Sequence, residues 1–323
     1  MKKIFALIFL LFVVDAGRAE DFDAYDDEFD LERWYEVLHK IQNEAVAQKI
    51  SGHVINAVIQ ESVFVPDVIR RDKNQAEFAR SMAKYLDDTV TAARVKHGKE
   101  MAKKYSAALK KVHDKYGVPP NVMLAFWGIE SDYGATKGRF TLSDSFLTLI
   151  YDGRRGTFFT SQLFALMKMA DKNKFDVRGV SGSWAGAMGH FQFIPTTLQQ
   201  YGADGNGDGK IDVMNSVADA MASAGNYLAK LGWSRGDRIA RRVKLPDGFD
   251  MSYCDGATKL RLSEWRKRGV GGVPQINKTA GIVCDESVFP TAYLTYENFY
   301  RVKRWNNSTN YAIAVALLSE RIQ

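Results

Sequence analysis

Apolar residues recur three and four positions apart from Leu31 to about Tyr116, as at Leu38 and Ile41. This spacing predicts a series of amphipathic helices. Residues 94–115 keep the period but are rich in lysine, which predicts one amphipathic helix with a hydrated basic face. An anionic partner on that face is the alternative.

A second group of helices is predicted after the Gly- and Pro-rich turn at 117–120. Pro119 and Pro120 suit the start of a helix. That helix continues through an almost wholly apolar run to Glu130, with Gly134 as its C-terminal cap. Further helices are predicted near 143–151, 157–171, 195–201 and 216–231, with a glycine-rich turn region at 179–190 and a polar loop at 203–212.

From about 239 to 300 the pattern changes, because Gly, Val, Thr and aromatic residues interleave with turns. This pattern predicts a small β-containing insert. Residues 310–322 are helical in pattern again, with Thr309 as a candidate cap. We therefore expect a mainly α fold in which 301–323 returns to the helical lobes of 20–238.

The first residues have the features of an export signal. Lys2 and Lys3 precede an apolar run of eleven residues at 4–14, and small residues lead up to Ala19. Such a run is too short for a bilayer, which takes about 20 residues. We expect a signal peptide at 1–19, with an apolar core helix as the alternative. Without a cysteine near the cleavage site for lipid attachment or a second long apolar run, the mature chain is expected to be exported, soluble and without a transmembrane segment.

Composition narrows the class of protein. The 323 residues are 46% hydrophobic and 25% charged, which excludes disordered, collagen-like and low-complexity chains. A net charge of +6 is too small to indicate nucleic acid, but it suits an acidic polymer or a negatively charged surface. Residues 20–32 carry eight acids, which predicts a solvated tail or a cap on a basic surface. The two cysteines, Cys254 and Cys284, are expected to pair in an oxidising compartment, with two free thiols as the alternative.

Glu130 is the carboxylate with the clearest chemical signature. It ends the apolar helix, and Trp127 and Phe126 lie three and four positions before it. Apolar neighbours and the negative end of the helix dipole both disfavour its charged form, so we expect a raised pKa. A carboxyl group that stays protonated near neutral pH is what cleavage of a glycosidic bond needs as its general acid. In the alternative, Glu130 caps the helix or pairs with a nearby cation: Lys137, Arg139 or Arg154.

Glu130 lies in one of several sequence blocks that occur in a fixed order. These are YGVPP at 116–120, WGIESDYG at 127–134, GSWAGAMG at 182–189 with FQFIP at 191–195, AGNYL at 224–228 and RWNNS at 304–308, with Asp72, Gln75 and Phe78 upstream. Together they resemble the motifs of the B-type lytic murein transglycosylases. The resemblance spans most of the chain and is specific, whereas a lone E-x-x-x-G would carry no information.

The resemblance implies a lysozyme-like helical catalytic core at about 117–235, a deep groove, a periplasmic location and peptidoglycan as substrate. In this family one glutamate, matched here by Glu130, protonates the bond between N-acetylmuramic acid and N-acetylglucosamine and then acts as a base. The substrate's N-acetyl group stabilises the cation and its C6 hydroxyl attacks, which leaves a 1,6-anhydro end. No cofactor is implied for the chemistry. The implied partners are glycan strands and complexes of cell-wall synthesis or secretion, not nucleic acid.

The resemblance also assigns residues to the groove. Ser183 and Tyr227 match positions that orient the intermediate and the N-acetyl group, and Gln192 and Asn306 match glycan-binding positions. Ser183 could otherwise be a turn former, and Tyr227 a core aromatic residue.

The arginine pair is assigned to the cleft, whereas the acid next to Glu130 is not assigned a catalytic role. Arg154 and Arg155 match an arginine pair that faces the cleft in the family, with surface cations as the alternative. Asp132 lies two positions from Glu130, on another helix face, and is left out of the catalytic set.

The polar loop that starts at 204 follows the opening of an EF-hand calcium loop. Its alternate positions carry side-chain oxygens: Asp204, Asn206, Asp208 and Asp212. The backbone carbonyl of Lys210 would serve at the seventh position, and Asp219 would replace the usual glutamate, because Asn215 stands at the twelfth. We expect weak Ca²⁺ binding with a stabilising role. A polar turn held by its own side chains is the alternative.

Two other functions stay open on the sequence alone. One is a non-catalytic peptidoglycan-binding or scaffold protein that keeps the groove, which the intact Glu130 and its surrounding motif residues argue against. The other is a lysozyme-like muramidase that hydrolyses the same bond, and only the resemblance separates it from a lytic transglycosylase.

Overall fold

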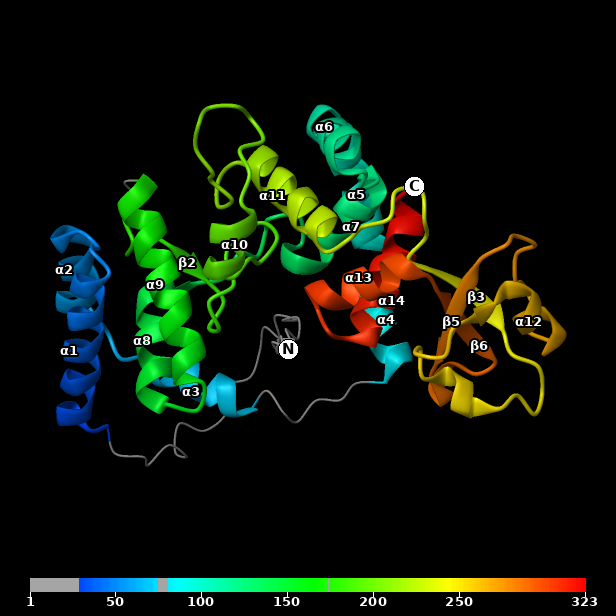
Figure 1. The fold of residues 1–323 in the computed structure, drawn as a ribbon, viewed down its shortest axis with the longest axis horizontal. Coiled ribbons are helices and arrows are strands. Elements are labelled where there is room, and N and C mark those ends of the chain that lie inside the picture. Colours follow the sequence, from blue (N-terminus) through cyan, green and yellow to red (C-terminus); the bar gives the residue numbers. More distant parts are fainter. Residues whose placement is uncertain (1–28, 75–80, 174) are drawn as a thin grey trace.

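The computed structural model describes residues 29–74, 81–173 and 175–323. The predicted signal peptide at 1–19, most of the acidic stretch, Gln75 and Phe78 lie outside these residues. The described chain is largely helical, with one four-stranded sheet at the end of the molecule opposite α1 (Leu31–Ala47) and α2 (Gly52–Gln60) (Figure 1). The predicted mainly α fold is confirmed. No helix in the described ranges is long and apolar enough to span a membrane.

Four more helices precede the Pro-Pro turn: α3 (Pro66–Lys73), α4 (Met82–Thr89), α5 (Ala92–Lys104) and α6 (Ser106–Tyr116). The single helix predicted at 94–115 is therefore wrong, because the chain breaks at Tyr105. The Tyr105 ring packs edge-on against the buried Trp127 ring, with 5.4 Å between centroids. Packing of this aromatic side chain into the core thus accompanies the break, which a periodicity argument cannot detect.

Helix α7 (Pro120–Ser131) starts at the second proline, as the sequence predicts. It ends at Asp132, which has a left-handed φ of 47° and is followed by Tyr133 at 60°. Aspartate tolerates this conformation because its short polar side chain can bond locally. The prediction of Gly134 as the cap is therefore wrong by two residues.

The central helices follow the predicted ranges closely: α8 (Leu142–Asp152), α9 (Gly156–Asn173), α10 (Pro195–Tyr201) and α11 (Val217–Lys230). Two short strands, β1 (Phe140–Thr141) and β2 (Ser181–Gly182), pair antiparallel and fix the start of the glycine-rich turn region. Gly186 in that region has a φ of 89°, and a Cβ there would lie 2.1 Å from the Phe146 ring, so only glycine fits.

The insert is an antiparallel sheet with strand order β3-β6-β5-β4. Its elements are β3 (Ala240–Lys244), the 3₁₀ helix η2 (Met251–Cys254), β4 (Leu260–Arg261), α12 (Leu262–Lys267), β5 (Thr279–Cys284), the 3₁₀ helix η3 (Glu286–Val288) and β6 (Thr291–Thr295). The insert has its own cluster of buried side chains, centred on Trp265. The structure contains a disulfide between Cys254 and Cys284.

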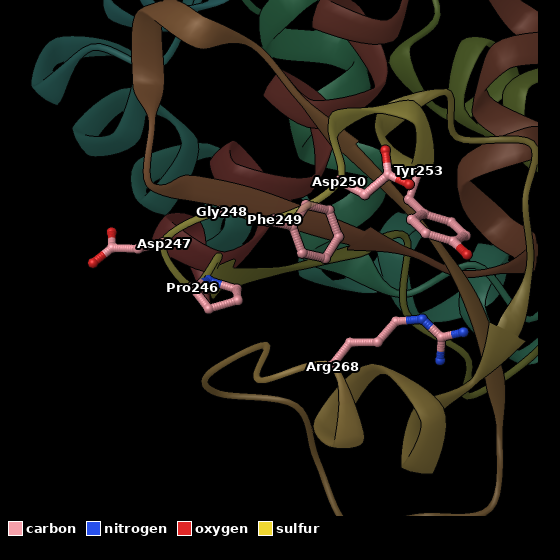
Figure 2. Close-up of a pocket in the computed structure, with 7 residues that line it drawn as sticks. All are labelled: Pro246, Asp247, Gly248, Phe249, Asp250, Tyr253 and Arg268. Atoms are coloured by element: carbon pink, nitrogen blue, oxygen red, sulfur yellow. The ribbon is translucent and has the colours of Figure 1, made fainter.

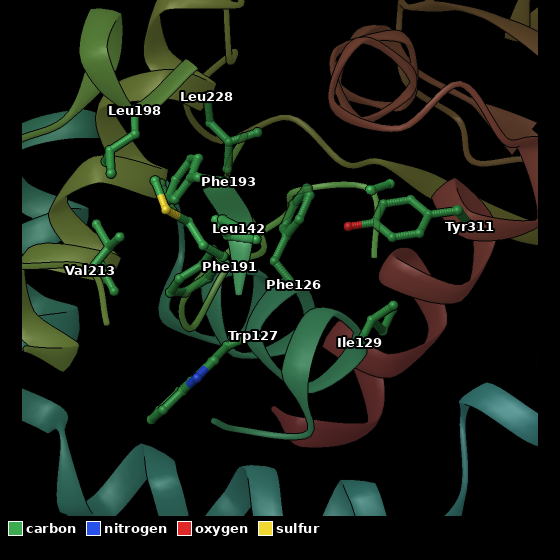
Figure 3. Packing of buried hydrophobic residues seen from close by; sticks show 14 of the residues in the cluster. Phe126, Trp127, Ile129, Leu142, Phe191, Phe193, Leu198, Val213, Leu228 and Tyr311 are labelled. Atoms are coloured by element: carbon green, nitrogen blue, oxygen red, sulfur yellow. The ribbon is translucent and has the colours of Figure 1, made fainter. Parts of the chain in front are cut away.

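The chain then returns to the helical part through α13 (Glu297–Trp305) and α14 (Thr309–Ile322). The boundary predicted at 300 falls inside α13. Helix α14 packs along α7 in the main core, where Phe126 and Tyr311 come from these facing helices (Figure 3). Its cap is Ser308, whose hydroxyl accepts the Tyr311 N–H at 3.2 Å, so the predicted cap at Thr309 is wrong by one residue.

Candidate active site

Glu130 lies in the last turn of α7 and lines a cleft of about 1030 Å³. Helix α13 supplies five of the lining residues, and α10, the segment 192–194 and the turn at 255–257 of the insert line the cleft as well. Many of the lining side chains are aromatic, which suits a ligand with apolar faces such as a sugar ring. Tyr201 stacks on Tyr227 at 4.8 Å, and Tyr227 lies 5.1 Å from Trp305.

Two neutral donors hold the Glu130 carboxyl group. Trp305 Nε1 donates to Oε1 at 2.9 Å, and the Tyr311 hydroxyl donates to the same oxygen at 2.5 Å. Among the described residues, Oε2 accepts no protein hydrogen bond. One oxygen is therefore fixed by the protein, while the other remains available for a proton or a ligand.

Burial raises the pKa of Glu130 from 4.5 to about 7. The hydrogen bonds from Tyr311 and Trp305 act in the opposite direction, because both favour the ionised form, but burial dominates. Phe126, four positions before Glu130, supplies part of this apolar environment, since its ring lies 4.9 Å from that of Trp305. The sequence prediction of a raised pKa thus agrees with the geometry.

The alternative in which Glu130 pairs with a nearby cation is wrong. Lys137 Nζ donates to the Met214 carbonyl at 2.6 Å. The other two named cations, Arg139 and Arg154, contact aspartates instead. Asp132, which is not among the expected catalytic residues, forms an ion pair with Arg94, with 3.6 Å between Oδ1 and Nε.

Three of the residues assigned by resemblance line the same cleft as Glu130: Gln192, Tyr227 and Asn306. The Gln192 amide nitrogen donates to the Gly189 carbonyl at 3.0 Å, and this residue has a left-handed φ of 48°. A non-glycine residue in that conformation indicates a constrained position, as binding sites often require. Asn306 is buried at the C-terminal end of α13.

Ser183 lies within the glycine-rich turn region and is not among the cleft-lining residues. Its hydroxyl accepts the Ala187 N–H at 3.0 Å, and its own N–H donates to the Ala187 carbonyl at 2.7 Å. These bonds match the turn-forming alternative. They still leave the hydroxyl proton able to donate, so its assignment to substrate stays a prediction.

Arg154 and Arg155 share a buried partner, Asp72. Arg154 Nε donates to Asp72 Oδ2 at 2.8 Å, and Arg155 binds the other carboxylate oxygen. Both arginine side chains keep substantial exposure, 48% and 30%, while they are paired. The Asp72 carboxylate therefore orients both guanidinium groups.

The sequence does not predict the contact of Tyr311 with Glu130, and it contains Trp305 only as part of the RWNNS block. A signal for Tyr311 exists in hindsight, because it is the aromatic residue in an otherwise small and aliphatic helix, YAIAVALLS at 311–319. A buried tyrosine usually requires a partner for its hydroxyl. The sequence cannot tell which acceptor lies opposite.

The loop at 204–212 is arranged around its own acids. Asp204 accepts the N–H groups of Gly207 at 2.6 Å and Gly209 at 2.8 Å, and the buried Asp219 accepts three more backbone N–H groups of the loop. Within the described residues, no three His, Cys, Asp or Glu side chains converge as a metal site. A carboxylate has about four lone-pair positions, so Asp204 and Asp219 keep acceptor capacity, and the all-oxygen donor set fits Ca²⁺ chemically.

A second, smaller hollow of about 400 Å³ lies on the insert (Figure 2). Phe249, Tyr253 and Arg268 line it, together with the turn at 246–250. It contains none of the residues assigned by resemblance and no buried acid, so the catalytic chemistry is assigned to the cleft at Glu130.

A family model described as the Transglycosylase SLT domain matches residues 33–320. The chain belongs to this family. The resemblance found in the sequence blocks is thereby confirmed.

Comparisons with individual proteins agree with this family assignment. Membrane-bound lytic murein transglycosylase B of Escherichia coli (strain K12) is 31% identical over 248 residues, which cover 74% of this chain and 66% of that protein, just under two thirds of its length. The crystal structure of SltB3 from Pseudomonas aeruginosa in complex with NAG-anhNAM-pentapeptide is 34% identical, with a TM-score of 0.85 over 90% of this chain and 79% of that one. The Escherichia coli lytic transglycosylase Slt35 in complex with calcium is 27% identical, with a TM-score of 0.78 over 88% and 92%.

The raised pKa of Glu130 in this SLT-domain protein predicts a pH-dependent stability. The contribution of Glu130 to the free energy of unfolding is fully present below about pH 4.5 and is lost as pH rises through about 7. The reason is that the folded state holds the proton more tightly than the unfolded state. Glu130→Gln should therefore be more stable than wild type above pH 7, by up to about 3 kcal/mol, and equal below pH 4.5. Urea unfolding at a series of pH values measures this difference.

Glu100→Gln, at an exposed position of α5, serves as the control and should follow the wild-type pH curve. A stability difference between Glu130→Gln and wild type that stays constant from pH 4 to 8 would contradict the assignment of a buried, protonated carboxyl group.

Proposed function

We propose that this SLT-domain protein is a lytic murein transglycosylase that cleaves the bond between N-acetylmuramic acid and N-acetylglucosamine in peptidoglycan. The observation that carries the proposal is the Glu130 carboxyl in an aromatic cleft, with one oxygen bound by two neutral donors and a pKa that burial raises to about 7. The two Escherichia coli relatives named above are lytic transglycosylases, and two SltB3 structures hold NAG-NAM or NAG-anhNAM pentapeptide ligands. Their activity comes to this chain as part of the proposal.

The chemistry requires Glu130 to work twice. In the first step its Oε2 donates a proton to the glycosidic oxygen, and the sugar's own N-acetyl group stabilises the cation at C1. In the second step the Glu130 carboxylate takes the proton from the C6 hydroxyl, whose oxygen attacks C1 and closes the 1,6-anhydro ring. No water enters the product, and Glu130 ends the cycle protonated as it began.

The lining of the cleft supports this one-acid scheme over hydrolysis by two carboxylates. The other carboxylate that lines the cleft within the described residues is Asp255 on the insert. It accepts the N–H groups of Ala257 at 2.7 Å and Thr258 at 2.9 Å, so it is bound to its own turn. Hydrolysis by two carboxylates requires a second acid about 5 to 9.5 Å from the first, across the cleaved bond. Because Asp255 is held by its own turn, the one-acid scheme fits the cleft better.

Residues around Glu130 are proposed to bind the glycan strand. Gln192, Tyr227 and Asn306 supply amide groups and an aromatic face within the cleft. Ser183, Arg154 and Arg155 are not among the side chains that line the cleft. They keep the roles that the family resemblance gives them, namely orientation of the intermediate for Ser183 and an arginine pair that faces the cleft. We further propose that the signal at 1–19 directs export to the periplasm. Complexes of cell-wall synthesis or secretion are candidate partners in that compartment.

We also propose that the loop at 204–212 binds a structural Ca²⁺ ion, since the Slt35 relative was solved in complex with calcium. Asp204, Asn206, Asp208, Asp212 and Asp219 would supply side-chain oxygens, with the carbonyl of Lys210. The ion would tie the loop to α11 and has no part in the proton transfers.

Replacement of the acid tests the proposed reaction directly. Glu130→Gln should reduce the release of soluble muropeptides from purified sacculi by about 10²- to 10⁴-fold, because the amide cannot transfer the proton. Mass spectrometry of the wild-type products should show 1,6-anhydro ends. Asp132→Asn, which changes a carboxylate outside the cleft, is the matched control and should remain active.

The products separate the competing functions. Hydrated reducing ends would indicate a muramidase, and binding to sacculi without any released product would indicate a scaffold protein.

The pH dependence of kcat/KM tests whether Glu130 is protonated in the free enzyme. Because Glu130 must start protonated, kcat/KM should fall as pH rises through about 7. Tyr311→Phe removes a hydrogen bond that favours the ionised form, so its falling limb should move to higher pH. The control is Tyr293→Phe, a buried tyrosine of the insert, for which the limb should stay in place. A limb that moves to lower pH in Tyr311→Phe would contradict this account.

Thermal unfolding tests the calcium loop. Ca²⁺ in excess should raise the Tm by several degrees, since about 100-fold excess over Kd contributes about 2.7 kcal/mol. Asp204→Asn should remove this shift, whereas Asp247→Asn, an exposed acid of the insert, should keep it. An unchanged Tm at millimolar Ca²⁺, or an equal shift in Asp204→Asn, would reject calcium binding at this loop.

A further inference from the structure

Helix α13 presents two cations to the cleft, next to the proposed reaction centre. Lys303 and Arg304 both line the cleft, and Phe299 and Tyr300 line it one turn earlier. Residues three and four apart share a helix face, so these four side chains form one stripe along α13. The stripe leads to Trp305, whose indole binds Glu130 at 2.9 Å.

Among the described residues, neither cation has a carboxylate partner. Lys303 Nζ contacts the Thr309 hydroxyl at 3.3 Å, and Arg304 Nη1 donates to the Leu231 carbonyl at 3.2 Å. The acid on the same helix, Glu297, is already bound by Lys259 at 2.6 Å and by Arg301 at 3.5 Å.

The cleft therefore carries unbalanced positive charge. Within the part of the chain that the structure describes, its charged lining residues are Glu130, Asp255, Lys303 and Arg304, and Glu130 is neutral when it is ready to act as an acid. The Asp255 carboxylate also accepts the Thr258 hydroxyl at 3.1 Å, in addition to the backbone bonds of its turn. Two cations thus face the bound ligand, whereas the Asp255 carboxylate is bound within its own turn.

We infer that Lys303 and Arg304 bind carboxylates of the peptide stem on the muramoyl residue beside the cleaved bond. The inference rests on the proposed function, because it assigns the substrate's charge to this site. The hydroxyl and acetamido groups of the glycan are neutral, and the lactyl carboxyl of muramic acid is consumed in the amide bond to the stem. The negative charge of the strand is therefore on the stem, where charge-assisted bonds from a lysine and an arginine can reach it.

The test compares soluble synthetic GlcNAc–MurNAc tetrasaccharides whose stem carboxylates are either free or converted to carboxamides. Enzymatic removal of the stem would be a poor comparison, because it exposes the lactyl carboxylate and leaves a charge in place. Wild type should show a KM about 3- to 10-fold lower for the free-carboxylate substrate, as expected of a partly exposed ion pair. This preference should shrink as salt rises from about 0.05 to about 0.5 M.

Lys303→Met should lose most of this preference through KM, whereas Lys303→Arg should keep it because the charge is retained. Arg304→Gln is the second variant and should lose part of the preference. Lys111→Met, at an exposed position of α6 outside the cleft, is the matched control and should behave as wild type. Thermal unfolding of each variant checks that the variant is folded before its KM is compared with that of wild type.

Two results would overturn the inference. One is a wild-type enzyme that cleaves both substrates with the same KM, and the other is full retention of the preference in Lys303→Met and Arg304→Gln. Failure of wild type to release anhydro products from either substrate would overturn the proposed function itself, and this inference with it.

Discussion

The active site depends on the burial of one carboxyl group at the end of α7. Its fixed oxygen, Oε1 of Glu130, is bound by Trp305 and Tyr311, which lie 175 and 181 residues further along the chain. The site is therefore complete only when the C-terminal helices fold back onto the core after the insert. The packing of α14 on α7 holds this closure, since most residues of both helices are buried.

The choice of donors explains how a buried polar group can be satisfied and still hold its proton. A cation within about 4 to 6 Å would lower the pKa of a carboxyl group by 1 to 3 units. Indole and phenol groups satisfy the oxygen with much weaker stabilisation of the charged form, so burial remains the dominant effect and the pKa reaches about 7. Two cations close to Glu130 in the sequence or the fold are bound elsewhere: Lys137 binds a backbone carbonyl, and Arg94 pairs with Asp132. The pKa of Glu130 is therefore set by burial and by its two neutral donors.

Much of this could be predicted from the sequence, because the signals are local. The position of Glu130 in an apolar helix predicts its raised pKa from residues three and four positions away. The helix ranges from α8 to α11 follow from periodicity and from the turns between them. Local signals fail where a tertiary contact decides. The break at Tyr105 coincides with packing against Trp127, and the role of Tyr311 depends on an acceptor in another helix.

The insert also shows why local patterns alone do not delimit a functional unit. It has its own buried cluster around Trp265, yet its turn at 255–257 lines the cleft. The contacts that hold that turn include the Cys254–Cys284 disulfide directly beside it and the Tyr300 hydroxyl, which donates to the Gly256 carbonyl at 2.6 Å. Tyr300 belongs to the same face of α13 as the two cleft cations. The position of the insert and the placement of charge in the cleft are therefore set by one helix, so a substitution that moves α13 alters substrate binding and the hydrogen bonds of Glu130 together.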